Sequence, residues 1–252
     1  MSVNTVQMLE MTWHDFRDKI KNNAVVVLPI GSTEAHGVHL PLGVDVITST
    51  GFAELLAKAI GGVVAPPIFY GYKGETGGGP IYEGSLELNA KTVIDLVHDV
   101  LEELVADGVK NIFIMNGHFE NEMFLLEAMD LITKKHPGVK IVESAWWDQF
   151  PDSLIDEIFT EVEFPGWAVE HAAIAETCLT MYFRPDLVNM DKFVEQEQIR
   201  VLSYHVSPIK REIYPSLGAP STSRGSTPEK GKLMVETVMK GFLEVAKEEF
   251  GV

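Results

Sequence analysis

Residues 24–30 read Ala-Val-Val-Val-Leu-Pro-Ile, an apolar run that never alternates with polar residues. Similar short runs occur over Gly62–Ile68, Asn111–Met115 and Val139–Val142. A strand with one buried face alternates apolar and polar side chains, whereas a strand buried on both faces is apolar throughout. The sequence therefore predicts four strands that are covered on both sides.

Segments with helical spacing separate these runs. Apolar residues recur at helical intervals over residues 46–60, 89–106 and 123–135. A last helix is expected to begin at Thr227-Pro228 and to run toward Phe250. Strands that alternate with helices favour parallel pairing. The predicted fold class is α/β, a mostly parallel sheet flanked by helices on both faces in three layers (α/β/α). No linker divides the chain, so one domain over residues 1–252 is expected.

The chain is acidic, with 20 Lys and Arg against 37 Asp and Glu and a formal net charge of −17. This charge repels the phosphates of nucleic acids and of anionic membranes, so neither is an expected partner. Every apolar stretch is shorter than the roughly 20 residues that a membrane-spanning helix needs. Cys178 is the single cysteine, and Met1–Glu10 lacks the pattern of a secretion signal. A cytoplasmic location is the expectation.

Most of the residues that could catalyse a reaction or bind a metal lie in the polar segments that follow the predicted strands. If the strands are parallel, these loops emerge at one carboxyl edge of the sheet, where open α/β sheets bind ligands. The loops are Gly31–Asp45, Gly71–Ser85, Asn116–Asn121 and Ala145–Phe150.

Two of these loops carry a histidine and a carboxylate two positions apart, as Glu34-Ala-His36 and as His118-Phe-Glu120. Residues i and i+2 of an extended backbone point the same way, so each pair can converge on one point. With Asp45 the set offers three oxygen and two nitrogen ligands, which suit Zn²⁺ or Mn²⁺. Five ligands serve two ions only if one carboxylate bridges them, and Asp45 is the candidate bridge. The alternative is that these residues cap helices and hold turns.

Other residues have both a functional and a structural interpretation. His171 begins a small-residue helical segment and is either a proton shuttle at the mouth of the site or a helix-surface histidine. Trp146, Trp147 and Trp167 either wall a pocket for a small planar molecule or belong to the core. The glycine-dense segment 71–79 lacks the spacing of nucleotide-binding loops, so a nucleotide site is not expected.

These motifs resemble the paired signatures of the creatininase (creatinine amidohydrolase) family. The resemblance rests on Leu28-Pro-Ile-Gly-Ser-Thr-Glu-Ala-His-Gly37, on Leu42-Gly-Val-Asp45 and on Asn116-Gly-His-Phe-Glu-Asn121. Further matches follow in order at Gly71-Tyr-Lys, Gly77–Gly79, Trp147-Asp148, Gly166-Trp167, Glu170-His171 and Glu176-Thr177. The resemblance therefore covers nearly the whole chain.

The family implies a homohexamer whose subunits bind two divalent ions, Zn²⁺ and Mn²⁺, and hydrolyse an amide-type C–N bond. By resemblance, Glu34 and His118 hold one ion, His36 and Glu120 hold the other, and Asp45 bridges them. His171 is implied as the proton shuttle, and with Glu120 it makes up the expected catalytic pair. The implied substrate contacts are Thr76, Phe119, Trp147 as an aromatic lid and Trp167 as a pocket wall.

Two residues depart from the creatininase pattern. Phe119 replaces a tyrosine that contacts the substrate, and Ala168 replaces an aspartate after the pocket tryptophan. A few placed hydrogen bonds set specificity, so these changes bear on the substrate. The leading hypothesis is hydrolysis of a cyclic amide, creatinine to creatine, by metal-activated water. The alternatives are a family member that acts on a formamide or a short peptide, and a non-catalytic metal or metabolite sensor.

Overall fold

The computed structural model describes residues 5–73, 82–195, 204, 206 and 214–252. Its centre is a four-stranded sheet in the order β2-β1-β3-β4. All neighbouring strands pair in parallel, which confirms the predicted pairing. The strands are β1 (Val26–Ile30), β2 (Val63–Val64), β3 (Asn111–Asn116) and β4 (Lys140–Ala145).

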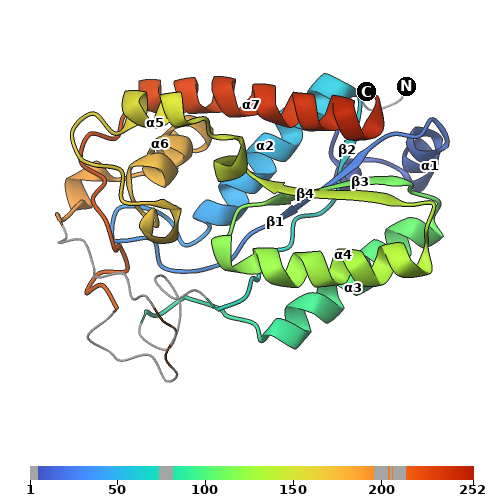
Figure 1. Ribbon diagram of the computed structural model, residues 1–252, viewed down its shortest axis with the longest axis horizontal. Helices are drawn as coiled ribbons and strands as arrows, with labels where there is room; N and C mark the ends of the chain where they lie inside the picture. The colour runs from blue at the N-terminus through green and yellow to red at the C-terminus, as the bar shows by residue number, and fades with distance from the viewer. Residues whose placement is uncertain (1–4, 74–81, 196–203, 205, 207–213) are drawn as a thin grey trace.

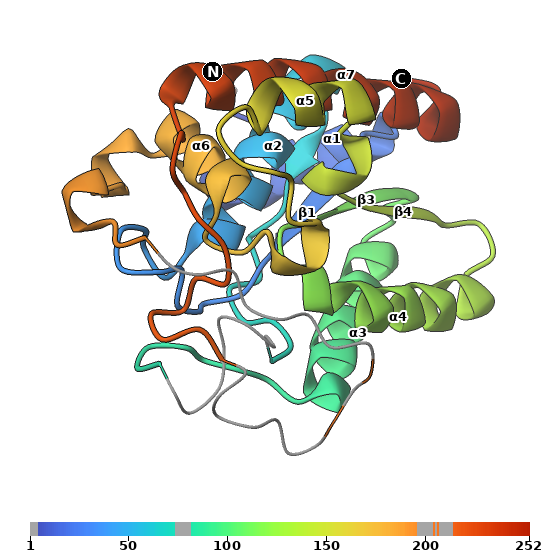
Figure 2. The same cartoon turned by 60° about the vertical axis from the view of Figure 1, so that its left-hand side comes forward.

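Helices cover both faces of the sheet, so the predicted three-layer α/β/α class is confirmed (Figures 1 and 2). One face carries α2 (Val44–Ile60), α5 (Asp152–Ile158), α6 (Ile174–Phe183) and α7 (Pro228–Phe250). The other carries α1 (Trp13–Lys21), α3 (Ala90–Ala106) and α4 (Glu122–Lys135). The 3₁₀ turns are η1 (Met8–Glu10), η2 (Phe119–Asn121), η3 (Trp146–Gln149), η4 (Trp167–Val169), η5 (Pro185–Leu187) and η6 (Met190–Lys192). Among the described residues, no helix combines the length and apolar character needed to cross a bilayer.

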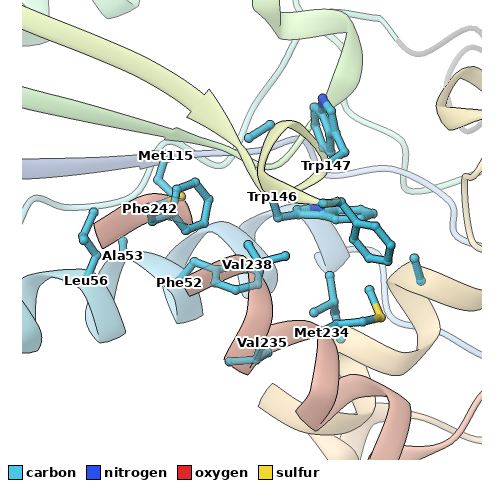
Figure 3. Packing of buried hydrophobic residues seen from close by; sticks show 14 of the residues in the cluster. Phe52, Ala53, Leu56, Met115, Trp146, Trp147, Met234, Val235, Val238 and Phe242 are labelled. Carbon is cyan, nitrogen blue, oxygen red and sulfur yellow. The ribbon is translucent and has the colours of Figure 1, made fainter. Parts of the chain in front are cut away.

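The unalternating apolar runs are explained by the two cores that the sheet separates. Val27 and Phe113 point to the core beneath α2 and α7, while Val26 and Ile112 point to the core beneath α3 and α4. Figure 3 shows the first core, in which Phe242 of α7 packs among side chains of α2 and β3. Both faces of β1 and β3 are therefore buried, as the composition of these strands predicts.

Some boundaries differ from the sequence prediction. The run over Gly62–Ile68 forms only a two-residue strand because Pro66 and Pro67 lack the N–H groups that would extend the ladder. A single bridge then joins Ile68 to Ile30. The strand predicted at Val139–Val142 instead runs to Ala145.

The segment expected to begin a helix at His171 is a turn, and α6 starts only at Ile174. Ala172 has a φ of 53°, which is incompatible with a right-handed helix and explains the later start. His171 therefore lies on a loop, next to the carboxyl edge of the sheet.

Candidate metal centre

Asp45 lies in the first turn of α2, between the ends of β1 and β3. The chain can approach this closely because glycine follows each strand. A Cβ at Gly117 would lie 2.2 Å from the Asp45 carbonyl oxygen, and one at Gly31 would lie 2.7 Å from Asp45 Cβ. The Ser32 N–H donates to Asp45 Oδ2 over 3.1 Å and fixes the carboxylate. Two glycines and one backbone amide thus set the position of Asp45.

The two imidazoles of the predicted site lie on opposite oxygens of this carboxylate. Asp45 Oδ1 is 2.9 Å from His36 Nε2, and Asp45 Oδ2 is 3.0 Å from His118 Nδ1. Glu34 Oε1 lies 3.1 Å from the same His118 nitrogen. The structure therefore brings Glu34, His36, Asp45 and His118 together, with Asp45 in the middle. All four are buried.

A third carboxylate joins the cluster, that of Glu176 in the first turn of α6. Its Oε2 lies 3.5 Å from His36 Nε2. Three groups of potential ligands result, Glu34–Asp45–His118, His36–Asp45–Glu176 and Glu34–His36–His171, with ligand atoms within 4.8 Å of one another in each. The motif Glu176-Thr177 matches the creatininase pattern, but the sequence predicts no role for Glu176. The available signal was a glutamate at the start of an otherwise apolar helix.

Glu120, the predicted partner of His36, lies at the rim of the cluster. Its Oε2 is 3.5 Å from His118 Nε2, and its side chain is 23% exposed. The backbone forms the 3₁₀ turn η2 over Phe119–Asn121, so the i, i+2 rule for extended chain does not hold here. Its role as a ligand stays a prediction, because none of the three groups of potential ligands includes it.

Backbone carbonyls fix the tautomer of both imidazoles. His36 Nδ1 lies 3.1 Å from the Glu34 carbonyl, and His118 Nε2 lies 3.0 Å from the Tyr72 carbonyl. A carbonyl only accepts hydrogen bonds, so these nitrogens carry the proton. The other nitrogen of each ring faces the carboxylates and can bind a metal ion once it gives up its proton. Metal-binding histidines in proteins show this arrangement.

The charges of the cluster favour a cation. Burial opposes a charge on His36 and His118, but the surrounding carboxylates outweigh burial and raise the pKa of both imidazoles well above the ordinary value. Burial also opposes ionisation of Asp45, yet the two histidines hold its pKa far below the usual range. Among the described residues, buried Glu34 Oε2 has no hydrogen-bond partner. The donor set, the tautomers and this free oxygen fit divalent metal ions.

His171 lies beside the cluster. Its Nε2 is 2.8 Å from the Ala35 carbonyl, so Nε2 carries the proton. Its Nδ1 is 3.7 Å from Glu34 Oε1, and its ring lies 4.2 Å from that of His36. The free nitrogen of His171 thus faces the ligand groups.

A pocket opens above this cluster, and aromatic rings form much of its wall. Its lining includes Phe119, Trp146, Trp147, Trp167, Ala168, Glu120, Glu170 and His171. The rings of Phe119 and Trp147 lie 5.9 Å apart. Trp146 contacts Trp147 and Trp167 edge-on. Trp146 and Trp147 both belong to the core beneath α2 and α7 as well, and the ring of Trp147 projects away from Phe242 (Figure 3). Thr76 lies outside the described residues.

The match to known proteins covers nearly the whole chain. The family model described as creatinine amidohydrolase matches residues 9–246. The creatinine amidohydrolase of Pseudomonas putida is 33% identical over 250 residues, which span 96% of each chain. The chain belongs to the creatininase family. It is therefore a creatininase-family amidohydrolase in its overall class.

Solved creatininases have the same fold. A Zn–Zn form of a creatininase variant and a Mn form both align with a TM-score of 0.93, at 32% and 33% identity. Each alignment covers 98% of this chain and 99% of the other. The chain is also similar to a mycofactocin precursor peptide peptidase of Mycolicibacterium smegmatis, with 30% identity over 68% of this chain and 62% of the peptidase. Membership in the family therefore does not define the substrate.

Proposed function

We propose that this protein hydrolyses the amide bond of a small cyclic substrate, with creatinine as the leading candidate, at a centre of two divalent metal ions. The observation that carries the proposal is Asp45, whose two oxygens face two different ligand groups. Glu34 and His118 would hold one ion with Asp45, and His36 would hold the other with Asp45 and Glu176 or Glu120. Such ions, Zn²⁺ or Mn²⁺, polarise a carbonyl and lower the pKa of water to near neutrality.

The protein's own residues would position the substrate and move the proton. His171 is bound to the Ala35 carbonyl through Nε2, so its Nδ1 is the nitrogen available to the pocket. There it would take a proton from the attacking water and deliver it to the leaving nitrogen of the amide, a role typically worth about 10²–10⁴ in rate. Phe119, Trp147 and Trp167 offer flat faces against which a planar ring can stack.

Substitutions separate metal binding from proton transfer. Asp45→Ala should lose metal and turnover together. His171→Ala should keep its metal content and lose about 10²–10⁴ in kcat on creatinine, because only the proton donor is removed. His98→Ala, at a surface histidine of α3, is the matched control and should behave like the wild type. Normal turnover by metal-replete His171→Ala would overturn the assignment of His171.

A panel of substrates separates creatinine hydrolysis from the other candidate functions. Phe119 and Ala168 both line the pocket and offer no polar side-chain group where the creatininase pattern has one. The metal-loaded protein should be incubated with lactams, formamides and short peptides. Faster turnover of a formamide or a peptide would replace creatinine as the substrate, and no hydrolysis of any compound would favour a sensor. The homohexamer stays a prediction, to be tested by the mass of the protein in solution.

A further inference from the structure

The turn that carries His171 contains a strained residue. Ala172 is fully buried and has a φ of 53°, in the left-handed region that alanine rarely adopts. Such a conformation is strained for an L-residue and persists only where surrounding contacts impose it. Asn23 is the other non-glycine residue with a positive φ in the described part of the chain, and asparagine tolerates this region. Contacts with other residues must therefore hold Ala172 in this backbone conformation.

Three buried side chains supply the restraint, and we call them the His39–Thr177–Ser223 cluster. Ser223 Oγ donates to the Ala172 carbonyl over 2.6 Å, and Thr177 Oγ1 donates to Ser223 Oγ over 3.1 Å. His39 Nε2 lies 2.9 Å from Ser223 Oγ. Because the single proton of Ser223 goes to Ala172, its oxygen must accept from both partners, so His39 carries its proton on Nε2.

The other side of the turn is held by carboxylates. The Ala172 N–H donates to Glu176 Oε2, and the Ala175 N–H donates to Glu170 Oε1, each over 2.6 Å. Both peptide groups of Ala172 are thus engaged. Its N–H is held by Glu176 of the ligand cluster, whereas its carbonyl is held by Ser223, which does not line the pocket.

We propose that His39, Thr177 and Ser223 are positioning residues, which hold the strained Ala172 turn so that His171 Nδ1 stays directed at the ligand cluster. The inference rests on the proposed role of His171 in proton transfer. Without the Ser223 hydroxyl, the Ala172 peptide can rotate toward an unstrained conformation, and the adjacent imidazole turns with it. Misplacement of a catalytic group by about 1 Å can lower a rate about 100-fold.

The primary test is Ser223→Ala in the metal-loaded enzyme. We expect kcat on creatinine to fall between 10-fold and 100-fold while KM and metal content stay unchanged, since the cluster does not line the pocket. Ser221→Ala is the matched control, because Ser221 is also buried but its hydroxyl has no hydrogen-bond partner among the described residues. A kcat for Ser223→Ala within twofold of that for Ser221→Ala would overturn the inference.

A rescue experiment distinguishes positioning from general loss of stability. Glycine adopts a positive φ without strain, so Ala172→Gly should restore at least part of kcat when combined with Ser223→Ala. In a His171→Ala background, Ser223→Ala should change kcat by less than twofold. No rescue, or a further large loss without His171, would count against the inference.

A readout independent of turnover keeps this inference separate from the proposed function. The ¹⁵N resonances of the His171 imidazole, assigned by comparison with His171→Ala, report its tautomer and surroundings. We expect these resonances to shift in Ser223→Ala and to stay in place in Ser221→Ala, whichever substrate the enzyme uses. Unchanged resonances in Ser223→Ala would refute the positioning role, even if creatinine proved to be the wrong substrate.

Discussion

Replacing Gly117 with alanine tests how tightly the fold positions Asp45. The added Cβ would lie 2.2 Å from the Asp45 carbonyl oxygen and 3.1 Å from Ser49 Cβ. Ordinary contact begins near 3.4 Å, so the start of α2 would have to retreat by about 1 Å. The neighbouring contact is with backbone, which cannot rotate out of the way as the end of a flexible side chain can.

A displacement of α2 by that distance matters because Asp45, in its first turn, is central to the proposed metal centre. Its oxygens lie 2.9 Å from His36 Nε2 and 3.0 Å from His118 Nδ1. Metal–ligand distances vary by only about 0.2 Å, so the displaced carboxylate can no longer serve both sets of ligands. We expect Gly117→Ala to weaken metal binding at least 10-fold and to lower kcat/KM on creatinine about 100-fold.

Metal content after dialysis against graded chelator is the primary measurement, with circular dichroism to show that the variant folds. The matched control is Gly43→Ala, two positions before Asp45, where an added Cβ meets nothing within 4 Å. This control should retain its metal even if the N-terminus of α2 is slightly less stable. A folded Gly117→Ala variant with the metal affinity of the wild type would refute the packing argument.

Two further predictions concern stability. Burial, and next the charge of Asp148, raises the pKa of Glu143 from an ordinary 4.5 to about 7. The folded state therefore holds this proton more tightly than the unfolded state does. The protein should lose stability as the pH rises from about 4.5 to 7. The glutamine of Glu143→Gln does not titrate. In urea denaturation, the free energy of unfolding of this variant should therefore rise by about 3 kcal/mol relative to the wild type between pH 4.5 and 8. A difference that stays constant with pH would contradict this prediction. Phe242→Ala should cost about 3–5 kcal/mol in the same assay, because its ring is fully buried against Phe113. Leu243→Ala, at the partly exposed next position, should cost far less, and equal costs would argue against the packing described.

The sequence was sufficient to predict the layers of the fold but not the order of its strands. Apolar runs such as residues 24–30 predict burial on both faces, and burial on both faces requires two helical layers. Strand order is different, because a parallel crossover places the next strand on either side of the previous one. In the structure β3 pairs with β1 and not with β2, an order that the apolar runs alone do not set.

Most of the candidate centre was predictable, since Glu34, His36 and His118 come from loops that follow strands of one parallel sheet. Their convergence follows from topology. The sequence does not indicate Glu176 as a ligand, because it lies on a helix, where a glutamate is ordinarily part of a solvated face. The packing of α6 against α2 and α7 buries it beside His36. The bond between His39 and Ser223 joins residues 184 positions apart, a separation that no local pattern reveals.

The chemistry of the site depends on the paths of its loops as much as on the ligands, because backbone carbonyls in these loops fix the tautomers of the histidines. His36, His118 and His171 each donate one ring proton to a carbonyl, those of Glu34, Tyr72 and Ala35 respectively. Every residue has a carbonyl, so the sequence holds no sign of which one will fix an imidazole. Once the strand ends and the glycines place these loops, the tautomers follow, and with them the nitrogen that each ring offers. A substitution that shifts a loop can therefore change which nitrogen faces the pocket without replacing any histidine.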